Sequence, residues 1–313
     1  MGRGSGYGKV ILFGEHFVVH GVPGIASAMS STADAEVRKI DTPGINIRDE
    51  RKGATGYTEK KKIQQRESID RMLKAMGLDK NISLDIWLGG NLPGFSGIGS
   101  SAASSVAIAR AISDELRLNF SDERINEIAY EAERAYAGTP SGIDNTAATF
   151  GGFIWFIKNL TGGPNKIERL SIKEPFEIIM ADTNVVADTK EMVLGVAERK
   201  KKYPEKYDRL FKQYEELSFK ARKTLEDFDL KQVGKLMNDN HRLLQGIEVS
   251  IKELDYLVEL ARKNGAYGAK LTGGGGGGCI VALTPGKELQ EKVAEAIERE
   301  GFKVLRTKVG VQR

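Results

Sequence analysis

Residues 92–103 form a stretch of small side chains with the sequence LPGFSGIGSSAA, between a strand-like segment and a helix-like segment. Such a turn leaves backbone N–H groups free at the start of the helix, where the helix dipole also favours negative charge. The stretch is therefore suited to an anion, such as the phosphates of a nucleotide. A tight turn that needs glycine for its backbone dihedrals explains these residues equally well when they are taken alone.

A second glycine-rich stretch follows Thr272, where six consecutive glycines occupy positions 273–278. Glycine lets the backbone approach a ligand closely. The alternative is a flexible turn, but the run leads directly into the apolar segment 279–284, which favours a functional role. No Walker A pattern (G-x-x-x-x-G-K-[ST]) occurs, so neither stretch is typical of a P-loop enzyme.

Several ionisable residues have the chemistry to act beside an anion. Lys9 stands at the start of an apolar strand, which is an odd place for a charge. By the 3.6-residue period Glu133 lies at the edge of an apolar helical stripe, and Asp144 follows the turn-like Pro140-Ser141-Gly142. His16 directly follows a strand. Taken alone, each is more commonly structural: an exposed strand-end lysine, a solvated helix flank, a turn-capping aspartate and a hydrogen-bonded histidine.

Composition excludes several other classes of function. The 313 residues, 40% hydrophobic and 29% charged, suffice for one large or two moderate domains. Lys and Arg number 47 against 43 Asp and Glu, and the surplus of +4 is too small to indicate nucleic-acid binding. The single cysteine, Cys279, precludes an intrachain disulfide and is expected to be a buried thiol. No His/Cys cluster has zinc-ligand spacing.

The N-terminus does not resemble a signal peptide, and no apolar run approaches the length of a membrane span. We therefore expect a soluble, cytoplasmic protein.

Apolar periodicity predicts the elements that position these residues. Strands are expected over 9–13, 32–44, 82–88, 153–157, 176–180, 279–284 and 302–309. Helices are expected over 64–77, after 101, from about 121, from 188 to about 264 with breaks at Pro204 and near Asp227, and over 287–300. Residues 47–66 are expected to form an exposed loop or hairpin. Strands and helices do not alternate strictly, which indicates an α+β fold.

Two capping-box patterns support the helices of the second half. Asp188 is followed three residues later by Glu191, and Ser250 by Glu253. Gly265 is expected just past the end of the second of these helices.

Three segments together resemble the superfamily of galactokinase, homoserine kinase, mevalonate kinase and phosphomevalonate kinase. They are GKVILFGEH at 8–16, the small-residue stretch from Pro93 to Ala103, and KLT at 270–272 with the glycine run. Three further segments are similar to the mevalonate kinases within it: FVVHG at 17–21, PSGIDN at 140–145, and MNDNH at 237–241 with Gly246 and Ser250. These motifs occur in the family's order across residues 8–283.

The resemblance implies a two-domain small-molecule kinase with its active site in the interdomain cleft. Residues 1–172 would form the N-terminal, ATP-binding domain and 173–313 the C-terminal domain. The implied reaction transfers the ATP γ-phosphoryl group, with Mg²⁺, to the 5-hydroxyl of mevalonate in isoprenoid biosynthesis, in an enzyme that is often a homodimer. Another kinase of the superfamily, acting on phosphomevalonate or a sugar, is the alternative, and a non-catalytic ligand sensor is a third.

The resemblance also assigns roles to residues. Asp144 matches the family's catalytic aspartate, which accepts the proton of the substrate hydroxyl. Lys9 matches the family's N-terminal lysine, which would favour the charged form of that carboxylate and neutralise charge on the transferred phosphate. Glu133, eleven residues before Asp144, matches the magnesium ligand. Ser101 would be the other protein ligand, although the adjacent Ser100 offers the same hydroxyl.

ATP phosphates would bind the stretch Phe95, Ser96, Gly97, Ile98, Gly99, Ser100 and Ser101. Glu15, His16 and Thr189 match positions near the substrate, and Thr189 also fits the capping turn of Asp188. Animal mevalonate kinases have a basic residue where this chain has Ala187. That difference leaves the partner of the substrate carboxylate unassigned.

Overall fold

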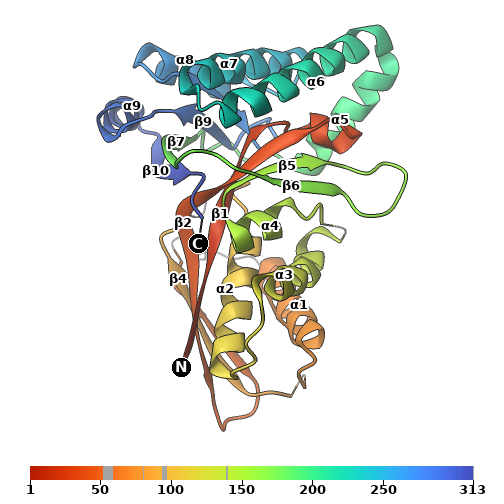
Figure 1. Ribbon diagram of the computed structural model, residues 1–313, viewed down its shortest axis with the longest axis vertical. Coiled ribbons are helices and arrows are strands. Elements are labelled where there is room, and N and C mark those ends of the chain that lie inside the picture. Colours follow the sequence, from red (N-terminus) through yellow and green to blue (C-terminus); the bar gives the residue numbers. More distant parts are fainter. Residues whose placement is uncertain (52–58, 80, 94–96, 139, 313) are drawn as a thin grey trace.

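The computed structural model describes residues 1–51, 59–79, 81–93, 97–138 and 140–312. Within them a mixed sheet of ten strands carries helices at both ends of an elongated molecule (Figure 1). The long strands β1 (Gly2–Phe13) and β2 (Gly24–Lys39) pair in antiparallel fashion and run through the middle.

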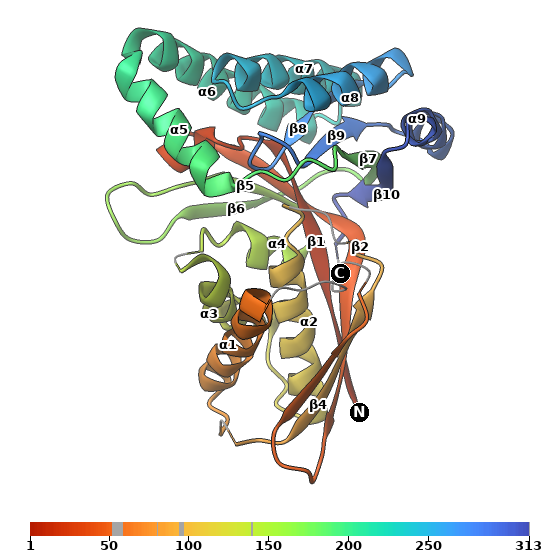
Figure 2. The same ribbon diagram turned by 180° about the vertical axis from the view of Figure 1, so that it is seen from behind.

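The first half of the chain completes the sheet around β2. β4 (Leu84–Gly90) and β5 (Phe153–Ile157) both pair with β2, β3 (Ile45–Asp49) lies parallel to β4, and β6 (Lys166–Leu170) lies on β5. Figure 2 shows the helices gathered on one side of β1 and β2. They are α1 (Glu59–Met76), α2 (Ser100–Glu115), α3 (Asp122–Ala137) and α4 (Ile143–Phe150). A short 3-10 helix, η1 (Phe17–His20), follows β1.

The second half builds the other end of the sheet in the order β10-β7-β9-β8. Its strands are β7 (Phe176–Asp182), β8 (Gly268–Thr272), β9 (Cys279–Leu283) and β10 (Lys303–Val309). Its helices are α5 (Thr189–Lys202), α6 (Pro204–Glu226), α7 (Leu230–Gly246), α8 (Lys252–Lys263) and α9 (Lys287–Arg299). A single residue pair, Val309 with Met29, joins β10 to β2.

Two large apolar clusters stabilise these parts. One lies among β2, β4 and α1–α3, and the other spans both halves of the chain. In the second cluster the ring of Phe17 stacks on Tyr214 of α6, with centroids 4.0 Å apart. The Tyr214 hydroxyl donates a 2.9 Å hydrogen bond to the Pro23 carbonyl. These contacts fix the segment after β1 against the C-terminal helices.

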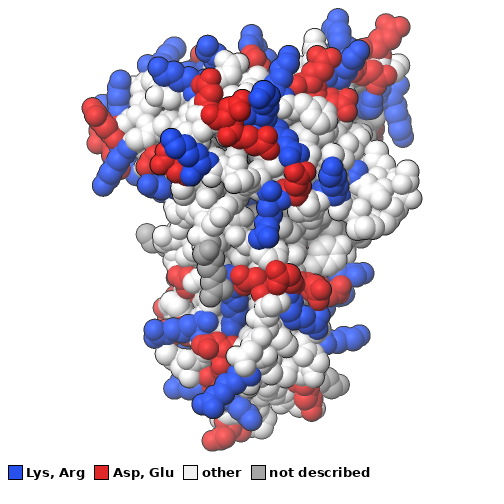
Figure 3. All heavy atoms as spheres, in the orientation of Figure 1, with Lys and Arg blue, Asp and Glu red and all other residues white. Residues whose placement is uncertain are grey.

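Charged side chains of both signs are mixed over the two helical ends of the face in Figure 3, and an uncharged band crosses its middle. No large patch of one sign is present on that face. None of the helices that the structure describes has the length and apolar character needed to cross a membrane.

The predicted strands and helices are confirmed in type, but β1 and β2 begin earlier than expected, and β2 ends at Lys39 and not at residue 44. β1 begins at Gly2 because Gly2, Gly4 and Gly6 lie against the backbone of α2. A Cβ on Gly2 would come within 2.2 Å of the Ala111 carbonyl oxygen. The first half of β2 consists mainly of small residues that are nearly all buried, so it has no period-two pattern.

Other elements were not expected. The segment 47–66 is not an exposed loop throughout, because it includes β3 and the start of α1, and Arg51 is buried. β6 was missed because three of its five residues are charged, and α4 because its eight residues follow the turn-like Pro140-Ser141-Gly142.

Of the two predicted helix caps, one is confirmed and one is wrong. Asp188 caps α5 by accepting hydrogen bonds from the N–H groups of Lys190 (2.7 Å) and Glu191 (3.4 Å). The expected cap at Ser250 is wrong, since α8 begins after Ile251 and the Ser250 hydroxyl instead donates to Asp255. The breaks at Pro204 and Asp227 are confirmed as the two ends of α6.

Candidate functional site

The small-residue stretch lies between β4 and α2, and its described part is tied to β1. The Lys9 N–H donates a 2.8 Å hydrogen bond to the Ile98 carbonyl. Gly97 and Gly99 have φ of 79° and 70°, the left-handed region that glycine adopts without strain. Gly99 precedes the first turn of α2 without a side-chain cap, so that turn presents its N–H groups at the loop. Two expected phosphate-binding residues, Phe95 and Ser96, lie outside the described residues.

Lys9 and Asp144 form an ion pair beside this loop. Lys9 Nζ lies 2.9 Å from Asp144 Oδ1 and 3.3 Å from the Gly97 carbonyl oxygen. The lysine is not at a strand end, because β1 extends seven residues before it, and only 7% of its side chain is exposed. Asp144 is the second residue of α4, and 38% of its side chain remains exposed. A carboxylate that can reach a ligand is thus paired with a buried cation beside the small-residue stretch.

Glu133 of α3 faces the first turn of α2. The Ser101 hydroxyl donates a 2.9 Å hydrogen bond to Glu133 Oε2, and the Ser105 hydroxyl lies 3.5 Å from Oε1. Burial, reinforced by the charge of Asp144, raises the pKa of Glu133 to about 7. The neighbouring Ser100 Oγ is buried and has no hydrogen-bond partner among the described residues. Of the two serines, Ser101 is the one that meets the carboxylate.

Glu15 forms a fully buried ion pair with Lys270 of β8, a contact that sequence reasoning missed. Lys270 Nζ also donates a 2.7 Å hydrogen bond to the Leu271 carbonyl. Burial raises the pKa of Glu15, and the charge of Lys270 opposes that shift. The second carboxylate oxygen, Oε2, finds no partner within the described part of the chain. The available signal was a lysine inside an apolar strand, the same anomaly that singled out Lys9.

His16 and Thr189 both lie against Gly274 of the glycine run. His16 Nε2 is 2.7 Å from the Gly274 carbonyl oxygen, and burial lowers the pKa of the ring. The neutral ring therefore donates its Nε2–H to that carbonyl. A Cβ on Gly274 would lie 2.6 Å from Thr189 Oγ1. The glycine run thus brings both predicted substrate residues to one loop.

The glycine run itself is a closely packed loop and not a flexible turn. The Gly276 N–H donates to the Val249 carbonyl and the Gly278 N–H to that of Val185, both at 2.8 Å. A Cβ on Gly275 would stand 2.3 Å from the Val249 carbonyl oxygen. Side chains are excluded at Gly275 and Gly277 because their Cβ atoms would meet the carbonyl oxygens of Val249 and Val185, whereas Gly273 and Gly278 have open space.

Three hollows border these residues. A cavity of about 1100 Å³ has Lys9 and Asp144 in its wall, and it extends along α3, α4 and the β5–β6 hairpin. A hollow of about 290 Å³ lies between Gly97, Thr189 and the glycine run. A third, of about 200 Å³, lies behind the start of α2 and is lined by Ser100, Ser101 and Arg51. The Lys9–Asp144 pair therefore borders open space next to the small-residue stretch, whereas Glu15 and His16 do not line the cavity of about 1100 Å³.

Comparison with known families gives two matches, one in each half of the chain. Residues 64–152 match the N-terminal domain of GHMP kinases, and residues 221–304 match the C-terminal domain of GHMP kinases. The first match contains Ser101, Glu133 and Asp144, and the second contains Lys270 and the glycine run.

Individual relatives agree with these matches. A mevalonate kinase of Pyrococcus horikoshii is 36% identical over 323 aligned residues, which cover 96% of this chain and 93% of the relative. A crystal structure of L. major mevalonate kinase in complex with R-mevalonate superposes with a TM-score of 0.92 at 36% identity, covering 99% of this chain and 96% of the other. The Methanococcus jannaschii mevalonate kinase structure shares the fold, with a TM-score of 0.82 at 22% identity and 98% coverage of both chains.

Proposed function

Because the chain belongs to the mevalonate kinases, a branch of the GHMP kinases, it phosphorylates mevalonate with ATP, and we propose that the Lys9–Asp144 pair is the centre of that transfer. The observation that carries the proposal is the 2.9 Å contact between Lys9 Nζ and Asp144 Oδ1 beside the first turn of α2. Lys9, Glu133 and Asp144 are all present, which disfavours a non-catalytic sensor.

Asp144 is the base in this proposal. Its partly exposed carboxylate borders the cavity of about 1100 Å³, where a substrate hydroxyl can approach within hydrogen-bond distance. The carboxylate accepts the proton of the 5-hydroxyl as the oxygen attacks the γ-phosphorus. Lys9 holds the carboxylate in place and puts a positive charge where negative charge accumulates on the transferred group.

The ATP phosphates lie along the loop that ends at Ser101. The uncapped N–H groups of the first turn of α2 and the backbone of Gly97 to Gly99 offer donors to phosphate oxygens. Phosphoryl transfer depends chiefly on such positioning and charge neutralisation. The loop is held in place through its bond from the Lys9 N–H, so base and phosphates share one support.

Ser101 and Glu133 fit a magnesium ion by the chemistry of their donors. Both offer oxygen ligands, which Mg²⁺ prefers, and it commonly takes one or two protein oxygens beside phosphate and water. The raised pKa of Glu133 also marks a carboxylate whose buried charge a cation would stabilise. Bound there, Mg²⁺ would neutralise charge on the phosphates of ATP.

Mevalonate is held from the other side by Glu15, His16 and Thr189. The Glu15 carboxylate keeps one oxygen without a partner among the described residues, and the neutral His16 ring is anchored to the glycine run. Thr189 stands across that run at the start of α5. These groups can orient the substrate so that its 5-hydroxyl faces Asp144.

The remaining features of the enzyme follow the family resemblance. We propose that residues 1–172 and 173–313 are its two domains, that it forms a homodimer and that it works in the cytoplasm.

A substrate panel tests the proposal. The protein is incubated with ATP, Mg²⁺ and, in turn, mevalonate, phosphomevalonate and galactose, and ADP release is followed. We expect turnover with mevalonate alone, and turnover abolished by Asp144→Asn with ATP binding retained. An Asp144→Asn enzyme with unchanged turnover would refute the proposed centre.

A further inference from the structure

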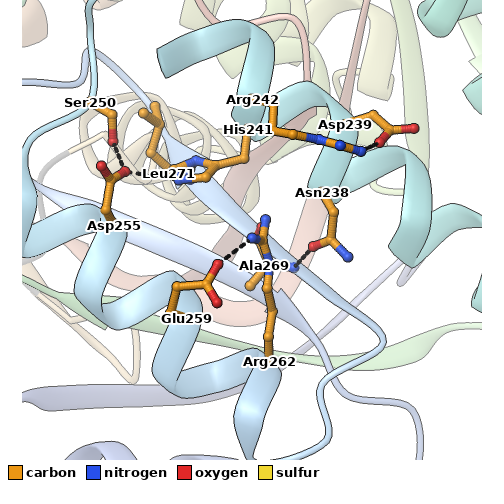
Figure 4. A network of polar contacts seen from close by, with 10 residues as sticks. All are labelled: Asn238, Asp239, His241, Arg242, Ser250, Asp255, Glu259, Arg262, Ala269 and Leu271. Atoms are coloured by element: carbon orange, nitrogen blue, oxygen red, sulfur yellow. Dashed lines mark hydrogen bonds and ion pairs between the residues drawn. The ribbon is translucent and has the colours of Figure 1, made fainter. Parts of the chain in front are cut away.

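The strand β8 lies at the edge of the sheet, and side chains of α7 and α8 cover its open side (Figure 4). The Ala269 N–H donates a 3.0 Å hydrogen bond to Asn238 Oδ1, and Arg262 Nη2 donates a 2.8 Å bond to the Ala269 carbonyl. The Leu271 N–H donates to His241 Nδ1 at 3.3 Å. The open edge is thus satisfied by side chains instead of another strand.

His241 is fixed in one tautomer by its two contacts. Because Nδ1 accepts the hydrogen bond from the Leu271 N–H, it carries no proton, and Nε2–H donates to Asp255 Oδ1 at 3.0 Å. The Ser250 hydroxyl donates to the same Asp255 oxygen at 2.6 Å. Only 2% of the His241 side chain is exposed. The ring is therefore a rigid spacer between α8 and β8.

The peptide that His241 holds is the one that carries Lys270. The Leu271 N–H belongs to the peptide bond after Lys270, and Lys270 Nζ donates back to the Leu271 carbonyl. The same ammonium pairs with Glu15 in full burial. The network in Figure 4 is therefore connected to Glu15, a proposed substrate residue, through the Lys270–Leu271 peptide and the Lys270–Glu15 ion pair.

Loss of the Nδ1 acceptor would leave the Leu271 N–H buried and unpaired, which is unfavourable. A shift of the backbone at Leu271 toward another hydrogen-bond partner would change the direction of the Lys270 side chain. Glu15 then loses its fixed cation. No other described partner can hold the carboxylate, because its second oxygen has none.

We propose that His241 is a positioning residue for the acceptor substrate, which holds Lys270 and through it the Glu15 carboxylate. The inference rests on the proposed contact of Glu15 with mevalonate. It gives the MNDNH segment at 237–241 a function in the kinase, although none of its residues belongs to the proposed centre of phosphoryl transfer.

Two amide variants separate the two contacts of the ring. His241→Asn places an acceptor oxygen near the position of Nδ1, so it keeps the bond to Leu271 and loses the bond to Asp255. His241→Gln places its amide near Nε2, so it keeps the bond to Asp255 and loses the bond to Leu271. Asp255 tolerates the first loss because Ser250 still donates to it and 39% of its side chain is exposed.

We expect His241→Gln to raise the KM for mevalonate by about fivefold or more and to leave the KM for ATP within about twofold, with His241→Asn close to the parent enzyme. Leu225→Ala, in the buried C-terminal end of α6, is the control for loss of stability. It should lower the Tm without raising the KM for mevalonate. Equal KM values in the two His241 variants, or a rise shared with Leu225→Ala, would overturn the inference.

A Glu15→Asp variant keeps the charge but shortens the side chain. It shows whether a negative result refutes the role of His241 or the role of Glu15. If Glu15→Asp raises the KM for mevalonate and His241→Gln does not, the role of His241 is wrong and that of Glu15 stands. If neither variant raises it, the proposed contact of Glu15 with the substrate is wrong, and the inference fails with it.

Discussion

Ser101 of α2 donates a 2.9 Å hydrogen bond to Glu133 of α3, at the start of the helix that follows the phosphate loop. Because both groups offer an oxygen ligand, we expect both to bind the same magnesium ion. Glu133→Gln keeps the shape and the hydrogen bond of the side chain but removes its charge. The Mg²⁺ concentration for half-maximal activity should rise about tenfold or more. An unchanged magnesium titration would show that Glu133 is not a ligand.

The raised pKa of Glu133 predicts a pH dependence of stability in the metal-free protein. The pKa of Glu133 rises from 4.5 in the unfolded chain to about 7 in the folded protein, so between these pH values the folded state holds more protons than the unfolded chain. Stability conferred by the protonated group is present below pH 4.5 and is lost as the pH rises toward 7. The Tm of the parent protein should therefore fall over this range relative to Glu133→Gln. Parallel Tm curves would contradict the prediction.

The buried pair of Glu15 and Lys270 predicts a large coupling between two residues that are distant in sequence. Removal of one partner leaves a buried charge without compensation, at a cost of about 3–5 kcal/mol. Glu15→Gln and Lys270→Met should each destabilise the protein by about this amount, and the double variant should cost less than the sum. Urea unfolding of the three variants measures the coupling. Additive losses would indicate that the two side chains do not interact.

The glycine run offers a matched pair of substitutions. Gly275 and Gly278 have similar φ of 67° and 73°, so alanine meets the same backbone strain at both positions. Only at Gly275 would the new Cβ also collide with a carbonyl oxygen, whereas nothing lies within 4 Å at Gly278. Gly278→Ala should lower the free energy of unfolding by about 1–2 kcal/mol, the cost of an alanine in the left-handed conformation. Gly275→Ala should lower it by clearly more. Equal unfolding free energies would refute the packed-loop description.

The two glycine stretches could be predicted because each is a local pattern. The lysine and aspartate beside the first are each more commonly structural when taken alone, and only the resemblance to the family singled them out. Lys9, Glu133 and Asp144 follow from the order of the motifs, and the structure places them around one loop. Their individual roles stay predictions.

Contacts that depend on topology could not be predicted from local patterns. Glu15 and Lys270 are 255 residues apart, and they meet only because β8 reaches the end of β1. The helix that carries Asp144 was not predicted, because the turn-like Pro140-Ser141-Gly142 directly precedes its eight residues. β1 was predicted to be too short because glycine normally disfavours a strand. Here the glycines allow close contact between β1 and α2.

The central claim is that Asp144, held by Lys9, is the base that accepts the proton of mevalonate. The most direct measurement is single-turnover phosphorylation of mevalonate by Asp144→Asn, alongside ATP binding by the same protein. We expect the rate of the chemical step to fall by about a thousandfold, within the range for loss of a general base, while the Kd for ATP stays within about threefold. A variant that transfers phosphate at the parent rate would contradict the account.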